Sequence, residues 1–521
     1  MVQLRAAFRA ALFLCFTGLY SQAVAQDITL TSYDGAVEIS GTLLGFDGQF
    51  YRVETIYGEL TVDGTGVRCE GPACPSLLDY VAEIRISGSA GMAEVLLPAL
   101  VEAFALRNQY GVTRVSKEAR RFEYHLSDRE TGKLLVKFLI HASNADEGFA
   151  DLLANEADIV MSLREIREKE ATRGYEAGLG DLTDPRRSHV LALDGLVPVV
   201  APGNPVRDIS PGTLARVFAG EIDSWKILGG PDAPIDLHLL TRKSGLTQAV
   251  EDQLMQPAEL SLSSQIKRHE TPDDLISAVS RAPFAIGMSA FSNTGAARVL
   301  DLSGGCGFTL SAARRSIKTE DYPLTAPMFL YLPARRLPKL ARAFLSYAVG
   351  PAAQIVIRRA GFVDQTPEEV PVTLQGDRFI NAISAAGEEI SLRELQSMVK
   401  LLAPRDRLTT SFRFEAGSAR LDAQSRSNVL LLARGLEAGT YDEREILFVG
   451  FSDGLGRATG NREIAQKRAE AVRKAVLEAA EAVDRELLST QVAAFGEAMP
   501  MACDDSAWGR QVNRRVEVWL R

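Results

Sequence analysis

The chain has 521 residues and a formal net charge of −9. This acidic balance argues against a nucleic acid as partner, and the length exceeds what one hydrophobic core serves, so we expect about three domains. After residue 25, no run approaches the roughly 20 consecutive apolar residues of a membrane-spanning helix.

The N-terminus has the layout of a cleaved secretory signal. Arg5 and Arg9 precede the apolar run AALFLCFTGLY, and small residues ending in AVA stand before Gln26. We therefore predict a signal peptide over residues 1–25 and an exported, periplasmic mature chain. Cys15 lies inside this segment, and the large residues before it do not suit a lipobox, so we assign it to the discarded signal.

Export places the remaining cysteines in an oxidising compartment. The stretch CEGPAC forms a tight loop through a glycine and a proline, so we predict a disulfide between Cys69 and Cys74. A zinc site is the competing interpretation, but no histidine lies nearby in the sequence. Cys306 and Cys503 fall in different predicted domains, and both a disulfide between them and two free buried thiols stay open.

Four segments follow the signal. Short alternating runs separated by Asp-Gly pairs occupy 26–80, and they predict a small β barrel or meander that serves packing or docking. Over 82–365, strands alternate with helices, as in IRIS followed by AEVLLPALVEAFALRN, which predicts α/β lobes with largely parallel sheets. A polar, semi-flexible linker with one helix, SLRELQSMVKLL, is expected over 366–408. Residues 409–521 are again α/β.

Two loops between a strand and a helix share one design. GSAGM follows EIRIS, and RKSGLT follows IDLHLLT. Glycines let the backbone approach a ligand, and the amides and dipole of a helix N-terminus favour an anion. The guanidinium of Arg242 and the hydroxyls of Ser89, Ser244 and Thr247 would complete an oxyanion site. Ordinary helix capping is the alternative for either loop alone.

Further stretches surround these loops in a fixed order: ADIVMSLREI, LALDGLVPVVAPGNPVRDISPGTLARVFAGEIDSWKILGG, AIGMSAF, YPLTAPMFLYLP and AGFV. Together they closely resemble the phosphate-type periplasmic solute-binding proteins of ABC importers, over about 82–365. The resemblance implies a two-lobed α/β fold of type II that closes on a small oxyanion without performing chemistry on it. The anion-binding residues that it implies are Ser89, Ser143, Arg242, Ser244, Gly245 and Thr247.

Some positions depart from that family's pattern. Leu163 stands directly after ADIVMS, where the phosphate binders place an acid that accepts the proton of hydrogen phosphate, and Arg164 follows it. Asp146 and Glu147 lie in the loop that holds Ser143, where negative charge opposes an anion unless it points away. The resemblance thus implies an anion site, with phosphate as its first candidate.

GFSDG, residues 450–454, fits the GxSxG pattern of a serine hydrolase elbow and follows the apolar run EILFV. In that fold the histidine base follows the serine in the chain, but all five histidines lie upstream of Ser452. The helix that should start at once is also delayed by LGRATGN. We therefore expect no enzyme and no cofactor.

The last segment contains FRFEAGSARLD, GFSDGLG, NREIAQKRAEAV, FGEAMP and GRQVNRRVEV, in this order. In order and spacing they resemble the OmpA-like peptidoglycan-binding domain, which captures the diaminopimelate of the stem peptide. The peptidoglycan-binding residues that the resemblance implies are Asp453, Asn461 and Arg468. Asp453 and Arg468 are the acid and base that clamp this zwitterion, and Asn461 can cap the helix that carries Arg468. Residues 513–515 match that family's NRR.

The pattern of this helix agrees with the assignment. An apolar stripe at helical spacing, with Arg468 at its edge, consists of Ala465, Ala469, Val472, Val476 and Ala479. An arginine that points into solvent is the alternative, because the helix is rich in lysine and arginine.

The sequence predicts an all-β N-terminal module, a two-lobed α/β periplasmic-binding-protein fold of type II, and a C-terminal α/β OmpA-like domain. The first functional hypothesis is a periplasmic, peptidoglycan-associated solute receptor that serves an ABC permease of the inner membrane. The outer membrane is a further candidate location. The second hypothesis is a wall-anchored scaffold or sensor whose middle domain is not a transport receptor.

Overall fold

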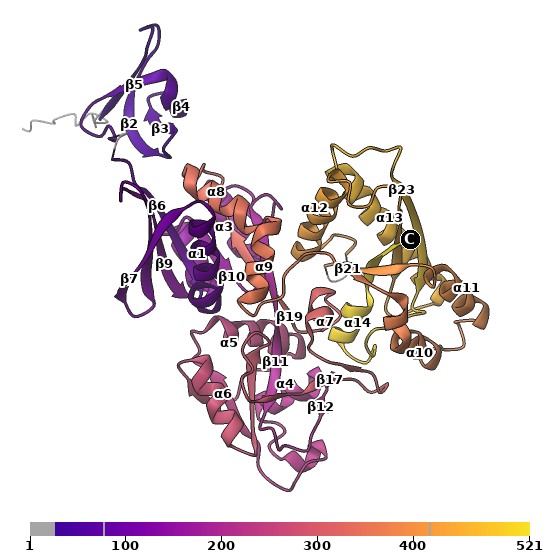
Figure 1. Cartoon of the computed structure of the whole chain (residues 1–521). Helices are drawn as coiled ribbons and strands as arrows, with labels where there is room; N and C mark the ends of the chain where they lie inside the picture. Colours follow the sequence, from indigo (N-terminus) through magenta and orange to yellow (C-terminus); the bar gives the residue numbers. More distant parts are fainter. Residues whose placement is uncertain (1–26, 77–78, 416–417) are drawn as a thin grey trace, which may run out of the picture. The chain divides into compact units, whose positions relative to one another are not determined.

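The computed structural model describes residues 27–76, 79–415 and 418–521. The predicted signal peptide lies outside the described residues. Contacts divide the chain into two compact units, with the boundary between Tyr80 and Val81. We call residues 27–80 the N-terminal module, and within the second unit we call 81–365 the middle domain and 366–521 the C-terminal domain (Figure 1).

The N-terminal module is one antiparallel sheet in the order β4-β3-β2-β1-β5. Its strands are β1 (Ile28–Ser32), β2 (Glu38–Phe46), β3 (Phe50–Thr55), β4 (Gly58–Asp63) and β5 (Val67–Glu70). Alternate side chains are buried, as at Leu30 and Val53, which is the period of a strand with one core face. Asp47 shows how the Asp-Gly pairs form turns, because its carboxylate accepts two backbone N–H groups. The disulfide between Cys69 and Cys74 is confirmed.

The middle domain is built on an 11-stranded sheet whose main path is β14-β13-β15-β11-β19-β10-β6-β9-β8-β7, with β16 paired to β11. Its strands are β6 (Ala82–Ser89), β7 (Tyr110–Glu118), β8 (Arg121–Asp128), β9 (Leu134–Ser143), β10 (Ile159–Ser162), β11 (Ser188–Val200), β13 (Asp236–Leu240), β14 (Lys267–His269), β15 (Ala285–Ala290), β16 (Arg298–Val299) and β19 (Thr325–Tyr331). A small separate sheet contains β12 (Asp208–Ile209), β17 (Asp301–Ser303) and β18 (Thr309–Leu310).

The helices of this domain are α1 (Leu97–Arg107), α2 (Ala145–Leu153), α3 (Glu168–Glu176), α4 (Pro211–Ala219), α5 (Gly245–Val250), α6 (Pro272–Arg281), α7 (Arg314–Lys318), α8 (Lys339–Ala348) and α9 (Pro351–Arg359). The prediction of largely parallel sheets was wrong. In the described 11-stranded sheet, only β6, β9 and β10 at one end and β13 to β15 at the other pair in parallel, and in the small sheet β12 pairs in parallel with β17. The strands between them, β11 and β19, run antiparallel to their neighbours, and the β7–β8 hairpin extends one edge.

β11 joins two lobes, because residues 188–195 pair with β19 and residues 196–200 pair with β15. We call the part around β6, β9, β10 and β19 the first lobe, and the part around β13 and β15 the second lobe. Asp194 lies where β11 changes partner. It accepts the backbone N–H groups of Gly195 and Ser292, but burial still raises the pKa of its carboxyl to about 6.

The C-terminal domain has one sheet in the order β20-β21-β24-β22-β23. Its strands are β20 (Glu369–Val370), β21 (Asp406–Arg413), β22 (Glu445–Phe451), β23 (Ser489–Gly496) and β24 (Arg515–Leu520). Its helices are α10 (Gly376–Ser384), α11 (Leu392–Leu402), α12 (Ala423–Glu437), α13 (Ala458–Ala479) and α14 (Ala507–Asn513).

The segment predicted as a linker is part of this domain, and it contains α10 as well as the predicted α11. Ile446 and Phe448 of β22 pack in one core with α12 and α13, whereas Leu447 and Val449 pack in a second core with α10 and α11. Because alternate residues of a strand face opposite sides, the two helix pairs cover opposite faces of the sheet (Figure 1). The prediction of a semi-flexible linker was therefore wrong.

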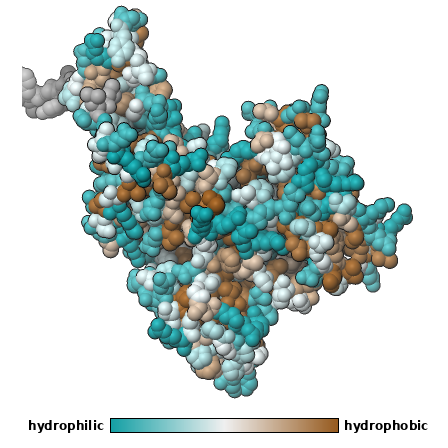
Figure 2. Space-filling model, viewed as in Figure 1, coloured by the Kyte–Doolittle hydropathy of each residue, from teal (hydrophilic) through white to brown (hydrophobic). Residues whose placement is uncertain are grey.

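The α10–α11 segment also carries the hydrophobic surface seen over these helices in Figure 2. Its exposed apolar side chains are Leu374, Ile380, Ile383, Leu392 and Val399. Among the described residues, no single helix is long and apolar enough to cross a membrane; only α8 and α9, a pair bent by 69°, reach that length and composition together.

Candidate functional site

Residues of both lobes converge near the N-terminal end of α5. Ser89 and Ser143 end the adjacent parallel strands β6 and β9, where they are register partners. Gly245 of the second lobe approaches them, and a Cβ atom on this glycine would lie 3.4 Å from the Oγ of Ser89. The Ser89 side chain is buried, and its hydroxyl has no hydrogen-bond partner among the described residues. Such a hydroxyl can donate to a ligand at little cost.

The backbone explains why β6 ends in this position. Gly88 has a φ of 130°, and a Cβ atom there would lie 2.1 Å from the carbonyl oxygen of Met161 in β10. Only glycine adopts this conformation at this distance without strain. Gly88 thus allows the strand to turn Ser89 towards the second lobe.

The other three predicted anion-binding residues are placed differently. The hydroxyl of Thr247 is buried and donates to the carbonyl oxygen of Leu240 at 3.1 Å. The Oγ of Ser244 caps α5 by accepting the N–H of Leu246 at 3.2 Å. Arg242, predicted to complete the oxyanion site, is exposed. The structure therefore brings Ser89, Ser143 and Gly245 together, and it leaves the guanidinium at the surface.

The acidic charge beside Ser143 is neutralised within the protein. Asp146 contacts Arg164 at 2.6 Å and Arg167 at 2.9 Å. Burial alone would lower the pKa of Arg164, but Glu170 and Asp146 outweigh it and raise that pKa. Asp146 thus points into an arginine cluster, which removes its part of the repulsion that the sequence suggested.

Several bonds cross from the first lobe to the second. The side-chain amide of Asn144 donates to the carbonyl oxygen of Lys243 at 3.1 Å, and the N–H of Ala145 donates to Gln248 at 3.2 Å. Arg167 also forms an ion pair with Asp252 at 3.0 Å. No local sequence pattern predicts these contacts, because residues about 100 positions apart meet only after the lobes fold.

The predicted peptidoglycan clamp forms a compact cluster in the C-terminal domain. Asp453, on the loop after β22, forms an ion pair with Arg514 at 2.7 Å. Arg468 of α13 is only 9% exposed, lies over the ring of Phe414 at 4.9 Å, and has a buried Nε without a described partner. Burial first, and then the charge of Arg514, lowers the pKa of Arg468. The interpretation of Arg468 as a solvated arginine is wrong.

Asn461 does not cap its helix as predicted. α13 begins at Ala458, so Asn461 lies within its first turns, and its side-chain amide donates to Glu497. The carboxylate of Glu389, between α10 and α11, accepts the N–H of Ala458 at 2.7 Å instead. A glutamate distant in the sequence thus makes a hydrogen bond at the start of the helix, the role that the local pattern predicted for Asn461.

GFSDG is not followed at once by a helix, since α13 starts after Arg457. The Oγ of Ser452 is buried, with 4% of the residue exposed, and has no hydrogen-bond partner among the described residues. It therefore lacks the base contact that would activate a nucleophile.

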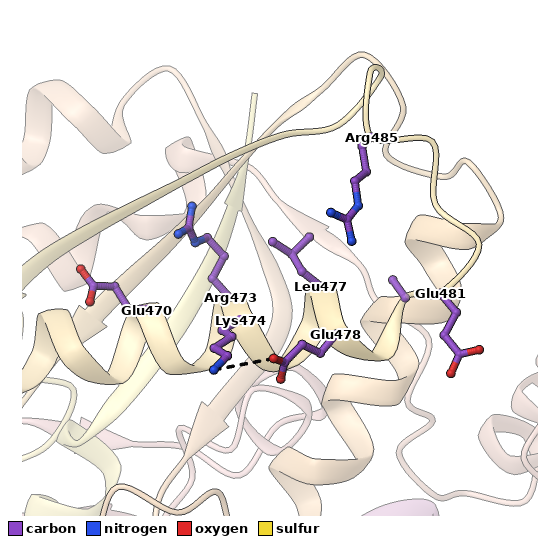
Figure 3. Close-up of a pocket in the computed structure, with 8 residues that line it drawn as sticks. Glu470, Arg473, Lys474, Leu477, Glu478, Glu481 and Arg485 are labelled. Carbon is purple, nitrogen blue, oxygen red and sulfur yellow. Dashed lines mark ion pairs between the residues drawn. The ribbon is translucent and has the colours of Figure 1, made fainter.

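A separate groove of about 620 Å³ runs along the C-terminal half of α13 (Figure 3). Its charged side chains carry both signs, and Lys474 pairs with Glu478 at 3.7 Å. None of the predicted peptidoglycan-binding residues lines this groove, so it provides matched control positions on the same helix.

The C-terminal domain contacts both lobes of the middle domain. Glu165 of the first lobe accepts the N–H of Ala423 at 2.7 Å, at the start of α12. Trp508 donates its indole N–H to the carbonyl oxygen of Gln253 in the second lobe, at 2.8 Å. Ala423 and Trp508 also belong to the hydrophobic core of the middle domain.

A disulfide joins the same two domains. Cys306 and Cys503, whose pairing the sequence left open, are bonded to each other. The segment between β17 and β18 of the second lobe is therefore covalently tied to the segment before α14.

The middle domain is similar to several known proteins, among them phosphate-binding proteins. Protein SphX of Synechococcus elongatus is 23% identical over 240 residues, which cover 44% of this chain and 69% of that protein. The phosphate-binding protein PstS of Bacillus subtilis is 27% identical over 185 residues, which cover 35% of this chain and 59% of that protein. An ABC-type phosphate transport receptor structure from Vibrio cholerae covers 54% of this chain and 99% of its own, with 20% identity and a TM-score of 0.42.

The C-terminal domain has a different set of relatives. The structure of the peptidoglycan-associated lipoprotein from Burkholderia pseudomallei covers 22% of this chain and 90% of its own, with 26% identity and a TM-score of 0.19. Residues 413–514 match the OmpA family model, and residues 60–352 match the model described as PBP superfamily domain. Because the latter match spans more than half of the chain, this chain belongs to the PBP superfamily and carries an OmpA-family domain behind its PBP domain.

Proposed function

We propose that this protein is an exported, periplasmic binding protein that holds a small oxyanion, phosphate first, and attaches to peptidoglycan without a covalent bond. The convergence of Ser89, Ser143 and Gly245 between the lobes supports the first part. The unpartnered Ser89 hydroxyl is the observation that carries it, because a buried donor without an acceptor is costly unless a ligand accepts its hydrogen bond.

Calorimetry of the mature chain with phosphate and sulfate tests the anion site. Ser89→Ala should weaken binding about tenfold, since it removes one direct hydrogen bond to the anion. Ser397→Ala is the matched control, because that hydroxyl is exposed on α11 and donates only to the carbonyl oxygen of Arg393. Binding of neither anion by the folded chain would remove the proposal of an oxyanion receptor.

Attachment to the wall is proposed to use Asp453 and Arg468, with the carboxylate facing the ammonium of diaminopimelate and the guanidinium facing its carboxylate. Arg468→Ala should weaken retention on purified sacculi about ten- to a hundredfold. Lys474→Ala removes a cation whose side chain is 74% exposed on the same helix. This variant should bind sacculi like the wild type. Equal retention of both variants would contradict the clamp.

Delivery to an ABC permease is the transport role that the phosphate-binding relatives favour, and co-purification with a permease would support it. One observation favours the alternative, a wall-anchored scaffold or sensor. The C-terminal domain contacts both lobes through Glu165 and Gln253, which restrains the lobe movement that a transport receptor uses.

A further inference from the structure

The segment 501–506, which we call the cysteine segment, is fixed on the second lobe of the middle domain. Cys503 is bonded to Cys306, and the carboxylate of Asp505 accepts the N–H of Gly305 at 2.6 Å. Cys503 and Asp505 of the cysteine segment are therefore tied to the successive residues Cys306 and Gly305 of the middle domain, one by a covalent bond and one by a charge-assisted hydrogen bond.

Asp504, which lies between Cys503 and Asp505, reaches the proposed wall site. One carboxylate oxygen of Asp504 accepts the N–H of Gly454 at 2.7 Å, and the other accepts the side-chain amide of Asn513 at 2.8 Å. Gly454 directly follows Asp453, the proposed acid of the clamp. Asp504 therefore fixes the backbone beside Asp453 without belonging to the clamp itself.

Asn513 of α14 also binds the backbone of the cysteine segment. Its side-chain oxygen accepts the N–H groups of Met501 at 2.7 Å and Ala502 at 3.1 Å, and the asparagine is fully buried. Arg514, the next residue, forms the ion pair with Asp453. The cysteine segment, Asn513 and Arg514 thus hold the loop of Asp453 at two points.

We propose that Asp504 is a positioning residue for peptidoglycan binding, and that the Cys306–Cys503 disulfide makes wall binding depend on the middle domain. This inference rests on the proposed function of Asp453 and Arg468. An exposed loop samples many conformations, and ordering it on binding costs affinity, so a loop held in advance binds more tightly. The disulfide restricts the conformations of the neighbouring Asp504. The hydrogen bond between Asp504 and Gly454 in turn restricts the backbone conformations of Gly454.

Asp504→Asn tests the first half in the full mature chain. An amide is a weaker acceptor than a carboxylate, and its NH2 group would face the N–H of Gly454 or the side-chain amide of Asn513. We expect about tenfold weaker retention on sacculi and a moved Gly454 amide resonance in a glycine-labelled 15N spectrum. Glu481→Gln, the same type of exchange at the end of α13, should change neither measurement.

Removal of the disulfide tests the second half. The double variant Cys306→Ser, Cys503→Ser should bind sacculi several-fold more weakly, with the same displacement of the Gly454 resonance. The double variant Cys69→Ser, Cys74→Ser removes the disulfide of the N-terminal module and should retain full binding. Mild reduction of the wild type should reproduce the first result, and reoxidation should reverse it.

The outcomes separate this inference from the function on which it rests. If Asp504→Asn and the Cys306 variant bind like the wild type while Arg468→Ala binds weakly, the clamp stands and the positioning role is wrong. If Arg468→Ala also binds like the wild type, the proposed wall site itself is wrong. Weak binding by all three, with an unmoved Gly454 resonance in Asp504→Asn, would overturn the positioning role as well.

Discussion

Arg407 of the C-terminal domain donates to Asp321 of the middle domain, with 2.7 Å between Nη1 and Oδ2. Both side chains are buried, and Arg413 contacts the same carboxylate at 3.1 Å. Burial alone would raise the pKa of Asp321, but the two arginines outweigh it and hold that pKa well below its ordinary value. The buried carboxylate of Asp321 in the middle domain is therefore paired with two arginines of the C-terminal domain. Separating the two domains would break these ion pairs.

Asp321→Asn should lower the free energy of unfolding by about 3 kcal/mol, because it removes the carboxylate that Arg413 contacts and leaves Arg407 only its ion pair with Glu517. Urea denaturation followed by tryptophan fluorescence measures this, since Trp225 reports on the middle domain and Trp519 on the C-terminal domain. Asp232→Asn breaks an exposed pair with Lys226 and should cost about 0.5 kcal/mol or less. Similar costs for the two exchanges would contradict the structural role of Asp321.

The buried carboxyl of Asp194 should make stability depend on pH. Burial raises its pKa from 3.8 to about 6, so the folded state holds the proton more tightly than the unfolded state does. The resulting stability is complete below about pH 4 and is lost as the pH rises through 6, a loss on the order of 3 kcal/mol.

Asp194→Asn is the matched variant, because an amide oxygen can still accept the N–H groups of Gly195 and Ser292. The difference in unfolding free energy between pH 5 and pH 7.5, measured for both proteins, isolates the contribution of this carboxyl. The wild type should lose more stability over this interval than the variant. A variant with an equal or larger loss would show that Asp194 is not the group responsible.

Ser452→Ala should leave sacculus binding unchanged and raise the unfolding free energy by about 1 kcal/mol or less, since it removes a buried hydroxyl without a described partner. Thermal unfolding and sacculus retention measure the two effects. Weaker retention would instead show that the Ser452 hydroxyl contacts peptidoglycan, in addition to Asp453 and Arg468.

The contacts of the C-terminal domain with both lobes should restrict the movement of one lobe relative to the other. Spin labels on one exposed residue of each lobe report the distance between lobes, and with the wild type this distance should change little when phosphate is added. Trp508→Ala combined with Cys306→Ser removes the indole hydrogen bond and the disulfide to the second lobe and should give a broader distance distribution. A large closure of the oxidised wild type on phosphate would contradict the restraint.

The amino-acid sequence by itself determined the order of the domains and most elements within them. Hydrophobic periodicity depends only on near neighbours, so it located β22, α12 and the long α13. In the apolar stripe of α13, four of the five predicted residues are buried, and Ala479 is partly buried. The spacing of Cys69 and Cys74 likewise predicted a local disulfide, because so short a loop keeps the two cysteines close together. Motif order was enough to indicate both domain families.

The tertiary structure alone decided how distant residues meet. Glu389, and not Asn461, accepts the N–H at the start of α13, and Arg242 lies at the surface. The supposed linker supplies α10 and α11 to one of the two cores of the C-terminal domain. The pairing of Cys306 with Cys503, 197 positions away, depends on the packing of one domain against another. No local pattern encodes such contacts, because their partners are selected by the shape and charge of whole surfaces once both domains have folded.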